Sequence, residues 1–527
     1  MARDPGGSMR LRSVGTVTVV ALSLASAMVS GSQAGAVASK GTVRTPTVTG
    51  PVTGGKGVSE IGTDIYDKPI GAGYESVGYV REEYFLEGDA VGYKPAGTLK
   101  SDGKWKVAAG DTAAYKTRMV VVKPKNPADF NGTVYVEWLN VTAGFDASRA
   151  WIFGHNEMLR EGAAWVGISA QAAGVTGSTT SAAAANNTVI AVPTGGLVKS
   201  DPARYGTLVH PGDLYSYDMF TQAGAAVKGD AKGVKPFAGY DVKRVIAIGE
   251  SQAAFRLTTY VNAVEPITSG VYDAYFILHR GGSSAPFGVQ VLDTPDPNIP
   301  HAVRIRTDLK VPVFTFQTEA DVQTLQYADA RQPDTKNIRT WEVAGTSHAD
   351  AYSGIPAISD FTSESGKAEG IEMAVTDPIH GSTNCAQPVN AGGQQAVVRA
   401  ALVQLVRWVK NGKSPTTYPK LKTTGTADTI DITRDANGVA LGGVRTPIVD
   451  VPTASNTGDV NTPELSCRLS GTKTVFDAAT LAKLYPAGSA DYVKKFDAAA
   501  DKAVKDGIWL QPEATNFKNA ASQITFG

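Results

Sequence analysis

The stretch "VIAIGESQAAFRLTTYV", residues 245–261, joins an apolar run rich in β-branched residues to a run of helix formers. Ser251 lies at the junction, with Gly249 two positions before it and Ala253 two positions after it. A serine exposed at a strand-to-helix corner needs small residues at these two positions, because the two backbones nearly touch there. The stretch therefore predicts a strand, a sharp turn that carries the Ser251 hydroxyl, and a helix.

The same pattern, Gly-x-Ser-x-Gly/Ala, occurs a second time in the chain as "GGSSA" at 281–285. That match also follows a predicted strand, but Pro286 comes next and no helical pattern develops. The usual form of the pattern has glycine at both flanking positions, so Ala253 is a departure, though a small one. The context favours Ser251 over Ser283 as the candidate nucleophile.

Strands and helices alternate along the chain on both sides of this stretch. Apolar runs predict strands at 117–124, 132–141, 163–171, 242–249, 272–279, 311–317 and 338–345, and amphipathic runs predict helices at 147–162, 213–228, 251–264, 393–412, 477–486 and 489–507. Apolar strands without strict alternation, separated by helices, indicate a mostly parallel sheet with helices on both faces. Such an open α/β fold places its site at the carboxyl ends of the strands.

Two carboxylates come directly after the strand predicted at 311–317. In a serine hydrolase on a sheet of this kind, the chain order is nucleophile, acid, histidine. The motif "QTEAD" supplies Glu319 and Asp321, and either carboxylate could hold an imidazole in its productive tautomer. We prefer Asp321 as the acid and keep Glu319 as the alternative.

His348 is the candidate base, because it alone combines a late position with a preceding strand. It lies in "GTSHAD", directly after the strand predicted at 338–345. The chain has six histidines. Those that come too early for the expected order are His155, His210, His279 and His301. The remaining one, His380, lies in "TDPIHGSTNC" away from any predicted strand, and we expect it to be structural.

A serine nucleophile also needs N–H donors for the oxyanion that forms during acyl transfer. The turn after Ser251 predicts the backbone N–H of Gln252 as one donor. The second should come from the loop after an earlier strand, and "VYVEWLNVTAGFD" suggests an N–H at or near Asn140. In the competing interpretation, Asn140 only caps a turn.

These motifs resemble those of the α/β-hydrolase superfamily: the corner at Ser251, the "QTEAD" loop and the "GTSHAD" loop. Further segments resemble a large bacterial family of secreted alpha/beta hydrolase domain proteins, namely "EWLNVTAGFD", "RYGTLVHPGDLYSYDMF", "LHRGG", "TNCAQPVN" and "CRLSGTKTVFD". The similarity covers roughly residues 60 to 515. It implies one continuous catalytic unit of the serine esterase type, with Ser251 as nucleophile, His348 as base and an acid at 319 or 321.

The charge balance of the chain limits its partners. There are 50 Lys and Arg residues against 50 Asp and Glu residues. A neutral balance argues against a nucleic-acid or anionic-membrane partner, because both need a basic surface. The chain contains neither an HExxH nor a CxxC motif, so nothing demands zinc, and we expect no metal and no other cofactor.

The N-terminal segment has the pattern of a cleaved signal peptide. Two arginines precede an apolar run at 14–29, and small residues suited to cleavage follow up to Ala36 and Ala38. We therefore expect residues 1–36 to be removed and the mature protein to be extracellular, with no stable membrane insertion.

The two cysteines of the chain, Cys385 and Cys467, would then form a disulfide in an oxidising compartment. The bond would close a loop of roughly eighty residues and contribute about 4 kcal/mol to stability. The alternative is two unrelated buried thiols.

Three regions are expected after the signal peptide, and one of them contains a further distinct segment. A flexible leader at 37–59 precedes a catalytic core at 60–420, and a C-terminal extension at 421–527, with a few strands over 426–452, packs on that core. Within the core, the proline-rich segment 283–309 has the character of a lid or of a surface excursion.

Together these features predict a secreted serine hydrolase that cleaves small-molecule or lipid-like carboxylic esters through an acyl-enzyme intermediate. Two alternatives use the same scaffold. One is an acyltransferase with the same three residues, and the other is a non-catalytic extracellular binding protein.

Overall fold

The chain is described here by a computed structural model that covers residues 43–58, 71–177, 195–268, 270–288, 296–354, 367–374, 385–426 and 429–526. Residues 37–527 make up one unit by their internal contacts. The expected signal peptide with its cleavage sites, and also His380, lie outside the described residues.

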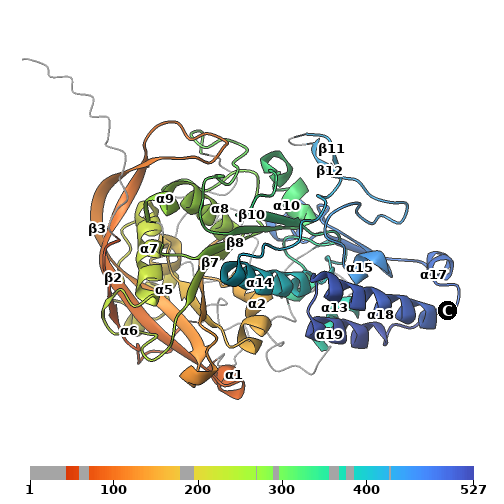
Figure 1. The fold of residues 1–527 in the computed structure, drawn as a ribbon, viewed down its shortest axis with the longest axis horizontal. Helices are drawn as coiled ribbons and strands as arrows, with labels where there is room; N and C mark the ends of the chain where they lie inside the picture. The colour runs from red at the N-terminus through yellow and green to blue at the C-terminus, as the bar shows by residue number, and fades with distance from the viewer. Residues whose placement is uncertain are drawn as a thin grey trace, which may run out of the picture. The chain divides into compact units, whose positions relative to one another are not determined.

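Ten strands form one sheet in the order β10-β9-β8-β7-β4-β5-β3-β2-β1-β6 (Figure 1). Six neighbouring strands are parallel to one another: β10 (Ile338–Glu342), β9 (Val313–Gln317), β8 (Ala274–Leu278), β7 (Arg244–Glu250), β4 (Thr133–Trp138) and β5 (Ala164–Ile168). Every residue of these six strands is buried, which explains why their sequences are continuous apolar runs. The predicted mostly parallel α/β sheet is confirmed.

The other side of the sheet is antiparallel, and the sequence predicted only part of it. The long strand β3 (Val107–Pro124) pairs antiparallel with β5 and with β2 (Tyr79–Pro95). The sequence indicated only residues 117–124 of this pair. Charged residues interrupt the apolar pattern of β2. One of them, Glu83, is buried and lies 3.6 Å from the guanidinium of Arg118, which is remote in the chain.

Part of the expected flexible leader is a strand of the sheet, and this corrects the prediction. β1 (Thr47–Thr49) pairs antiparallel with β2 and parallel with β6 (Lys232–Gly233). A three-residue strand whose partners both lie far along the chain leaves no periodic signal in the local sequence. The boundary of the leader expected over 37–59 therefore lies before residue 47.

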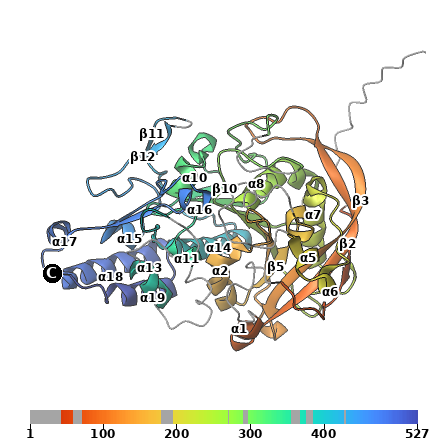
Figure 2. The same cartoon turned by 180° about the vertical axis from the view of Figure 1, so that it is seen from behind.

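Helices cover both faces of the sheet: α2 (Arg149–Arg160), α7 (Ser216–Val227), α8 (Gln252–Thr259) and α14 (Gln394–Asn411). Successive side chains of a strand point to opposite faces. Ile246 of β7 accordingly lies in a buried cluster with residues of α2 and α14, and its neighbour Ala247 lies in a second cluster with residues of α7 and α8. Figures 1 and 2 show these helices from the two sides.

The remaining elements precede, connect or follow this framework. They are α1 (Gly71–Ser76), η1 (Pro127–Asp129), α3 (Ala172–Val175), α5 (Gly196–Ser200), α6 (Pro202–Tyr205), η2 (Asp213–Tyr215), the π-helical turn η3 (Tyr260–Val264), α9 (Glu265–Thr268), α10 (Glu319–Gln323), η4 (Tyr327–Ala330), α11 (Ala351–Gly354), α13 (Lys367–Ala374), β11 (Thr423–Thr424), β12 (Asp431–Ile432), α15 (Pro447–Asp450), β13 (Ala454–Thr457), α16 (Leu465–Arg468), β14 (Thr472–Val475), α17 (Ala478–Leu484), α18 (Ser489–Asp506) and α19 (Gln511–Ala521).

The C-terminal region shares the hydrophobic core of the sheet. Tyr492 and Phe496 of α18, with Trp509 after it, lie in the same buried cluster as Trp341 of β10. Where the sequence suggested strands over 426–452, the structure has the two-residue β12 and the short helix α15, which begins at a proline. Proline fixes the backbone in a conformation suited to a first helical turn.

The described parts of the proline-rich segment 283–309 contain neither helix nor strand. Both flanks contribute buried side chains, among them Phe287, Val303 and Ile305. The N–H of Val303 donates to the carbonyl of Gly282 at 2.8 Å. The flanks of this segment are therefore part of the core, while residues 289–295 lie outside the described residues.

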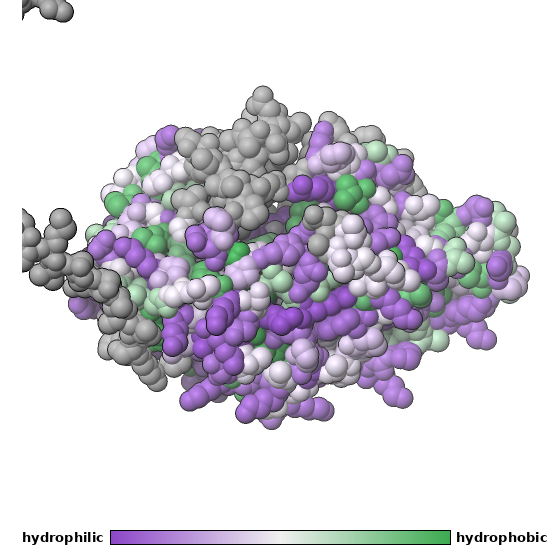
Figure 3. Space-filling view, turned by 90° about the horizontal axis from the view of Figure 1, so that it is seen from above, coloured by the Kyte–Doolittle hydropathy of each residue, from purple (hydrophilic) through white to green (hydrophobic). Residues whose placement is uncertain are grey.

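The surface is mainly hydrophilic in the view of Figure 3. Among the described residues, the exposed large hydrophobic side chains are scattered valines: Val77, Val209, Val234, Val460 and Val475. In the same part of the chain, none of the helices combines the length and the apolar character that a bilayer crossing requires.

Candidate active site

Ser251 occupies a strained corner between β7 and α8. Its φ and ψ are 57° and −121°, a combination that costs free energy for any residue except glycine. The corner is held by the backbone on both sides. The N–H of Ser251 donates to the carbonyl of Leu278 at 3.0 Å, and its own carbonyl accepts from Ala254 at 2.8 Å.

The small residues on either side of Ser251 meet the packing requirement that the sequence indicated. A Cβ placed on Gly249 would lie 3.0 Å from the Leu257 side chain and 3.2 Å from the backbone of Ala253. Ala253 itself is completely buried. The backbones of β7 and α8 therefore approach each other closely here, and the extra methyl group of Ala253 fits.

Ser251, His348 and Asp321 lie in a line of two hydrogen bonds. The Nε2 atom of His348 is 2.8 Å from Ser251 Oγ, and its Nδ1 atom is 2.6 Å from Asp321 Oδ1. With the proton on Nδ1, the ring donates to the carboxylate and presents its Nε2 lone pair to the hydroxyl. The structure thus brings together the three residues that the sequence singled out.

The second oxygen of Asp321 is held by the start of α10. Asp321 Oδ2 accepts from the N–H and from the hydroxyl of Thr318, both at 2.7 Å. Thr318 in turn caps the helix by accepting from the N–H of Asp321. This reciprocal capping arrangement fixes the carboxylate and leaves one oxygen for the imidazole.

Glu319, the alternative acid, points elsewhere. Its buried carboxylate accepts from the N–H groups of Gly345 at 2.5 Å and Gly458 at 3.1 Å, and lies 2.8 Å from the guanidinium of Arg434. Burial outweighs these contacts and raises the pKa of Glu319 above its usual value. Glu319 therefore links its own segment to those of Gly345, Gly458 and Arg434. The carboxylate that contacts the imidazole of His348 is Asp321.

The loop that carries His348 is anchored by the C-terminal region. The carbonyl of Leu469 accepts from the N–H of Ala349 at 3.0 Å and from the hydroxyl of Ser347 at 2.7 Å. The side-chain amide of Gln394 donates to the carbonyl of Ser347 at 2.7 Å. No sequence pattern indicated this anchor, because residues 347 and 469 are far apart in the chain.

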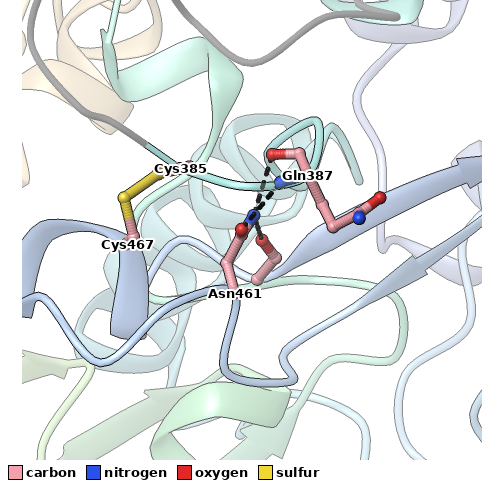
Figure 4. The surroundings of a disulfide bond; sticks show 5 residues. Cys385, Gln387, Asn461 and Cys467 are labelled. Atoms are coloured by element: carbon pink, nitrogen blue, oxygen red, sulfur yellow. Dashed lines mark hydrogen bonds between the residues drawn. A yellow bond between two sulfur atoms is a disulfide. The ribbon is translucent and has the colours of Figure 1, made fainter.

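The predicted disulfide between Cys385 and Cys467 is present, with the two Cα atoms 5.3 Å apart (Figure 4). Beside it, the side chain of Asn461 accepts from the N–H of Gln387 and donates to the carbonyl of the same residue, both at 2.9 Å. The disulfide therefore ties the segment before α14 to the segment that anchors the His348 loop, two residues before Leu469.

The two residues expected to donate to the oxyanion lie in different surroundings. Gln252 is the first residue of α8, as the prediction for its N–H requires. The N–H of Asn140, however, donates to the carbonyl of Ala147 at 2.9 Å, so it is not available to a ligand and this part of the prediction is wrong. The loop closes on itself, and the Asn140 side chain accepts from the N–H of Thr142 at 2.8 Å, as in the capping interpretation.

A second buried pair, which the sequence did not indicate, lies beside the three residues. Glu250 Oε1 is 3.1 Å from Nδ1 of His279 and 3.7 Å from Nε2 of His348. Arg149 lies 3.9 Å from the other oxygen of Glu250. Chain order had excluded His279 as a base, but its position at the end of β8, directly beside β7, was a signal for a place at the site.

Each member of this pair shifts the pKa of the other towards the charged form. Burial alone would raise the pKa of Glu250, but the hydrogen bond from His279 and the nearby Arg149 and His348 lower it. Burial alone would lower the pKa of His279, but the carboxylates of Asp321 and Glu250 raise it above its ordinary value.

The same atoms are the described group best suited to a metal ion. Ligand atoms of Glu250, His279 and His348 all lie within 4.8 Å of one another, and a carboxylate with two imidazoles is a donor set that Zn²⁺ accepts. In the arrangement seen here, each of these atoms already faces a protein partner.

The competing serine pattern at 281–285 is not part of this site. The hydroxyl of Ser283 donates to the carbonyl of Pro300 at 3.1 Å, and the described residues that follow it, 284–288, contain no helix. Of the two serines in this pattern, Ser251 lies beside His348 and Ser283 contacts Pro300.

A serine at a strand-to-helix corner, followed in the chain by its acid and then its histidine at the carboxyl edge of a mostly parallel sheet, is the arrangement of the α/β hydrolases. The chain belongs to this class. Residues 48–519 match the family described as "Alpha/beta hydrolase domain", so the protein is a member of that family.

Solved structures similar to this chain include esterases and a serine hydrolase. A fungal esterase from Rhizomucor miehei is 12% identical, with 52% of this chain and 77% of the esterase covered and a TM-score of 0.27. A glucuronoyl esterase from Solibacter usitatus is 10% identical over 59% and 85%, with a TM-score of 0.25. A serine hydrolase without a lid from Xanthomonas campestris is 10% identical over 44% and 80%, with a TM-score of 0.26. A search of curated proteins found no match.

Proposed function

We propose that this protein is a serine hydrolase that cleaves carboxylic esters of small or lipid-like molecules. The observation that carries the proposal is the pair of short hydrogen bonds that join Ser251 Oγ to His348 and His348 to Asp321, at 2.8 and 2.6 Å. A hydroxyl with a neutral imidazole beside it, and a carboxylate behind the imidazole, is the arrangement that activates serine as a nucleophile.

In the proposed reaction, Ser251 Oγ attacks the acyl carbon while Nε2 of His348 takes the hydroxyl proton. Asp321 stabilises the imidazolium that forms, and the N–H of Gln252 donates to the oxyanion. The imidazolium then gives its proton to the departing alcohol and leaves an acyl-enzyme. A water molecule, deprotonated by His348, attacks this ester and releases the acid.

We further propose that the protein acts outside the cytoplasm, after removal of residues 1–36. The disulfide between Cys385 and Cys467 supports this, because such bonds persist in oxidising compartments. N-terminal sequencing of the protein recovered from the culture medium of the native host tests it.

The function is tested with a fluorophosphonate probe and a series of nitrophenyl esters of increasing acyl length. We expect the probe to label wild type but not Ser251→Ala, and we expect ester turnover to disappear in the same variant. Ser283→Ala is the matched control, because it changes the other serine of the same pattern, and it should keep both signals.

Three outcomes separate the alternatives. Equal ester turnover in wild type and Ser251→Ala would refute the proposal. Absence of labelling in folded wild type would favour a binding protein on a hydrolase scaffold. Transfer of the acyl group to an added alcohol, in preference to water, would identify an acyltransferase.

A further inference from the structure

A cationic side chain beside the site has hydrogen-bonding capacity that the protein does not use. Arg149, the first residue of α2, has a side chain that is 27% exposed, and its Nε lies 3.9 Å from Oε2 of Glu250, whose side chain is 1% exposed. This distance is too long for a hydrogen bond. The described residues offer the guanidinium neither a hydrogen bond nor another ion pair, so its donors are free for a ligand.

The carboxylate of Glu250 connects Arg149 to the proposed catalytic residues. Its other oxygen, Oε1, lies 3.7 Å from Nε2 of His348, the nitrogen that is 2.8 Å from Ser251 Oγ. Arg149 is thus one carboxylate group away from the atoms that would react. Because Arg149 is partly exposed and Glu250 is buried, a ligand that enters from solvent can reach the guanidinium but not the carboxylate.

Helix α2 presents Arg149 to the site. Phe153 follows Arg149 by four residues, and side chains with this spacing lie on the same face of a helix. The ring of Phe153 meets the ring of His279 edge-on, with the two centroids 5.5 Å apart. Since Nδ1 of His279 lies 3.1 Å from Glu250 Oε1, the face of α2 that carries Arg149 is the face that packs against the site.

The backbone at the start of α2 is already occupied. The carboxylate of Glu137 accepts from the N–H groups of Ala150 at 2.8 Å and of Trp151 at 2.9 Å. These N–H groups are therefore not available to an anion from outside. The group that remains for such an anion at this end of the helix is the side chain of Arg149.

Arg280, which follows β8 at the same edge of the sheet, shows the opposite arrangement. Its side chain is 1% exposed. The carbonyl groups of Gly281, Gly282 and Val303 accept hydrogen bonds from it. The donors of Arg280 therefore hold the chain together, whereas those of Arg149 face no acceptor within bonding distance in the described part of the protein.

We propose that Arg149 binds a carboxylate of the substrate, so that the preferred esters carry a second, ionised acid group. The inference rests on the proposed ester hydrolysis at Ser251. A guanidinium presents parallel N–H donors that match the two oxygens of a carboxylate. Because Nε is the atom that faces Glu250, the two terminal nitrogens are left for this pairing. Without Arg149, the carboxylates of Glu250 and Asp321 would repel such a substrate.

The test compares matched pairs of esters that differ only in this charge. Monomethyl adipate carries a carboxylate on the acyl side, and methyl adipamate has an amide in its place. The acetyl esters of γ-hydroxybutyrate and of γ-hydroxybutyramide place the same difference on the alcohol side. In at least one pair, we expect wild type to hydrolyse the charged ester with a kcat/KM about ten- to a hundredfold higher, the range for hydrogen bonds to a charged group.

The readout is the ratio of the two kcat/KM values within a pair, because a general loss of activity cancels in it. Arg149→Gln should abolish the preference, and Arg149→Lys, which keeps the charge without the paired donors, should leave an intermediate ratio. Added salt should lower the ratio in wild type. Arg445→Gln is the matched control, since Arg445 is 32% exposed and pairs with Asp450, and it should keep the wild-type ratio. All assays contain a chelator, so that a metal ion cannot supply the preference.

Binding to Ser251→Ala separates this inference from the proposed function. By calorimetry, Ser251→Ala should bind the charged ester more tightly than its amide, and the added change Arg149→Gln should remove the difference. If wild type hydrolyses none of the esters, the proposed function fails and calorimetry decides on Arg149. Equal kcat/KM values within both pairs, equal affinities where there is no hydrolysis, or a preference that persists in Arg149→Gln would overturn the inference. If Arg149→Gln does not fold, Arg149→Lys decides, and an unchanged ratio in that variant would overturn it.

Discussion

Replacing Asp321 by asparagine tests the site most directly, because the hydrogen bonds fix which way the new amide must point. One carboxylate oxygen accepts two bonds from Thr318, at 2.7 Å each. The amide NH₂ cannot take this place, because it would put donors against donors. In Asp321→Asn the amide oxygen therefore faces Thr318, and the NH₂ group faces Nδ1 of His348.

The consequence is the wrong tautomer of His348. An NH₂ group 2.6 Å from Nδ1, in place of the carboxylate oxygen there, requires a lone pair on that nitrogen. The ring proton then sits on Nε2 and points at Ser251 Oγ, so the base is lost while the shape is kept. In serine hydrolases a change of this kind lowers kcat by about ten-thousand-fold, which corresponds to about 5.4 kcal/mol of transition-state stabilisation.

The assay is burst and steady-state hydrolysis of a nitrophenyl ester, with thermal unfolding as the check on folding. Glu319→Gln is the matched control, because Glu319 is a buried carboxylate two positions before Asp321 in the chain. It should lose about 1–3 kcal/mol of stability, through its contacts with Gly345, Gly458 and Arg434, with kcat close to wild type. A folded Asp321→Asn that keeps kcat within a factor of about ten, or an equal loss of kcat in Glu319→Gln, would refute the reasoning.

Three further results are expected. Gly249→Ala should lower the free energy of unfolding, measured by chemical denaturation, by about 1–3 kcal/mol, because the new Cβ lies 3.0 Å from a leucine side chain and 3.2 Å from the α8 backbone. An unchanged free energy of unfolding would mean that the corner has room for a methyl group. Replacing Cys385 and Cys467 by serine should lower the free energy of unfolding by about 4 kcal/mol, because the disulfide closes a loop over 82 residues. The same change should also lower kcat. A loss of stability without a loss of kcat would show that the His348 loop holds its position without the disulfide. Zn²⁺ should inhibit hydrolysis reversibly, since three buried ligand atoms lie within 4.8 Å of one another, and inhibition that persists unchanged in Glu250→Gln would place the ion elsewhere.

The sequence predicted the parallel half of the sheet because a strand buried on both faces has a continuous apolar run. Most of the antiparallel half lacks such a run. Within β2 the charged residue Glu83 is buried beside Arg118, a residue remote in the chain, and the short strand β1 has partners on β2 and β6. Local pattern cannot show a strand whose stability depends on remote partners.

At the site, chain order and the position of strand ends sufficed for Ser251, for His348 and for the acid loop. The choice between Glu319 and Asp321 needed the helix cap at Thr318, which directs one carboxylate into the site and leaves the other to bind backbone N–H groups. Asn140 was wrongly expected to offer its N–H, because its bond to Ala147 closes a loop whose shape the sequence does not specify.

The carbonyl of Leu469 accepts hydrogen bonds from Ser347 and Ala349, and this has a consequence for the synthesis of the protein. A growing chain released from the ribosome only as far as residue 460 already carries the serine, the acid and the histidine, yet lacks the acceptor that holds the last of these in place. If the proposed ester cleavage is correct, activity should then arise only late in synthesis, once the final stretch of polypeptide has docked, and a chain that ends at residue 460 should be inactive.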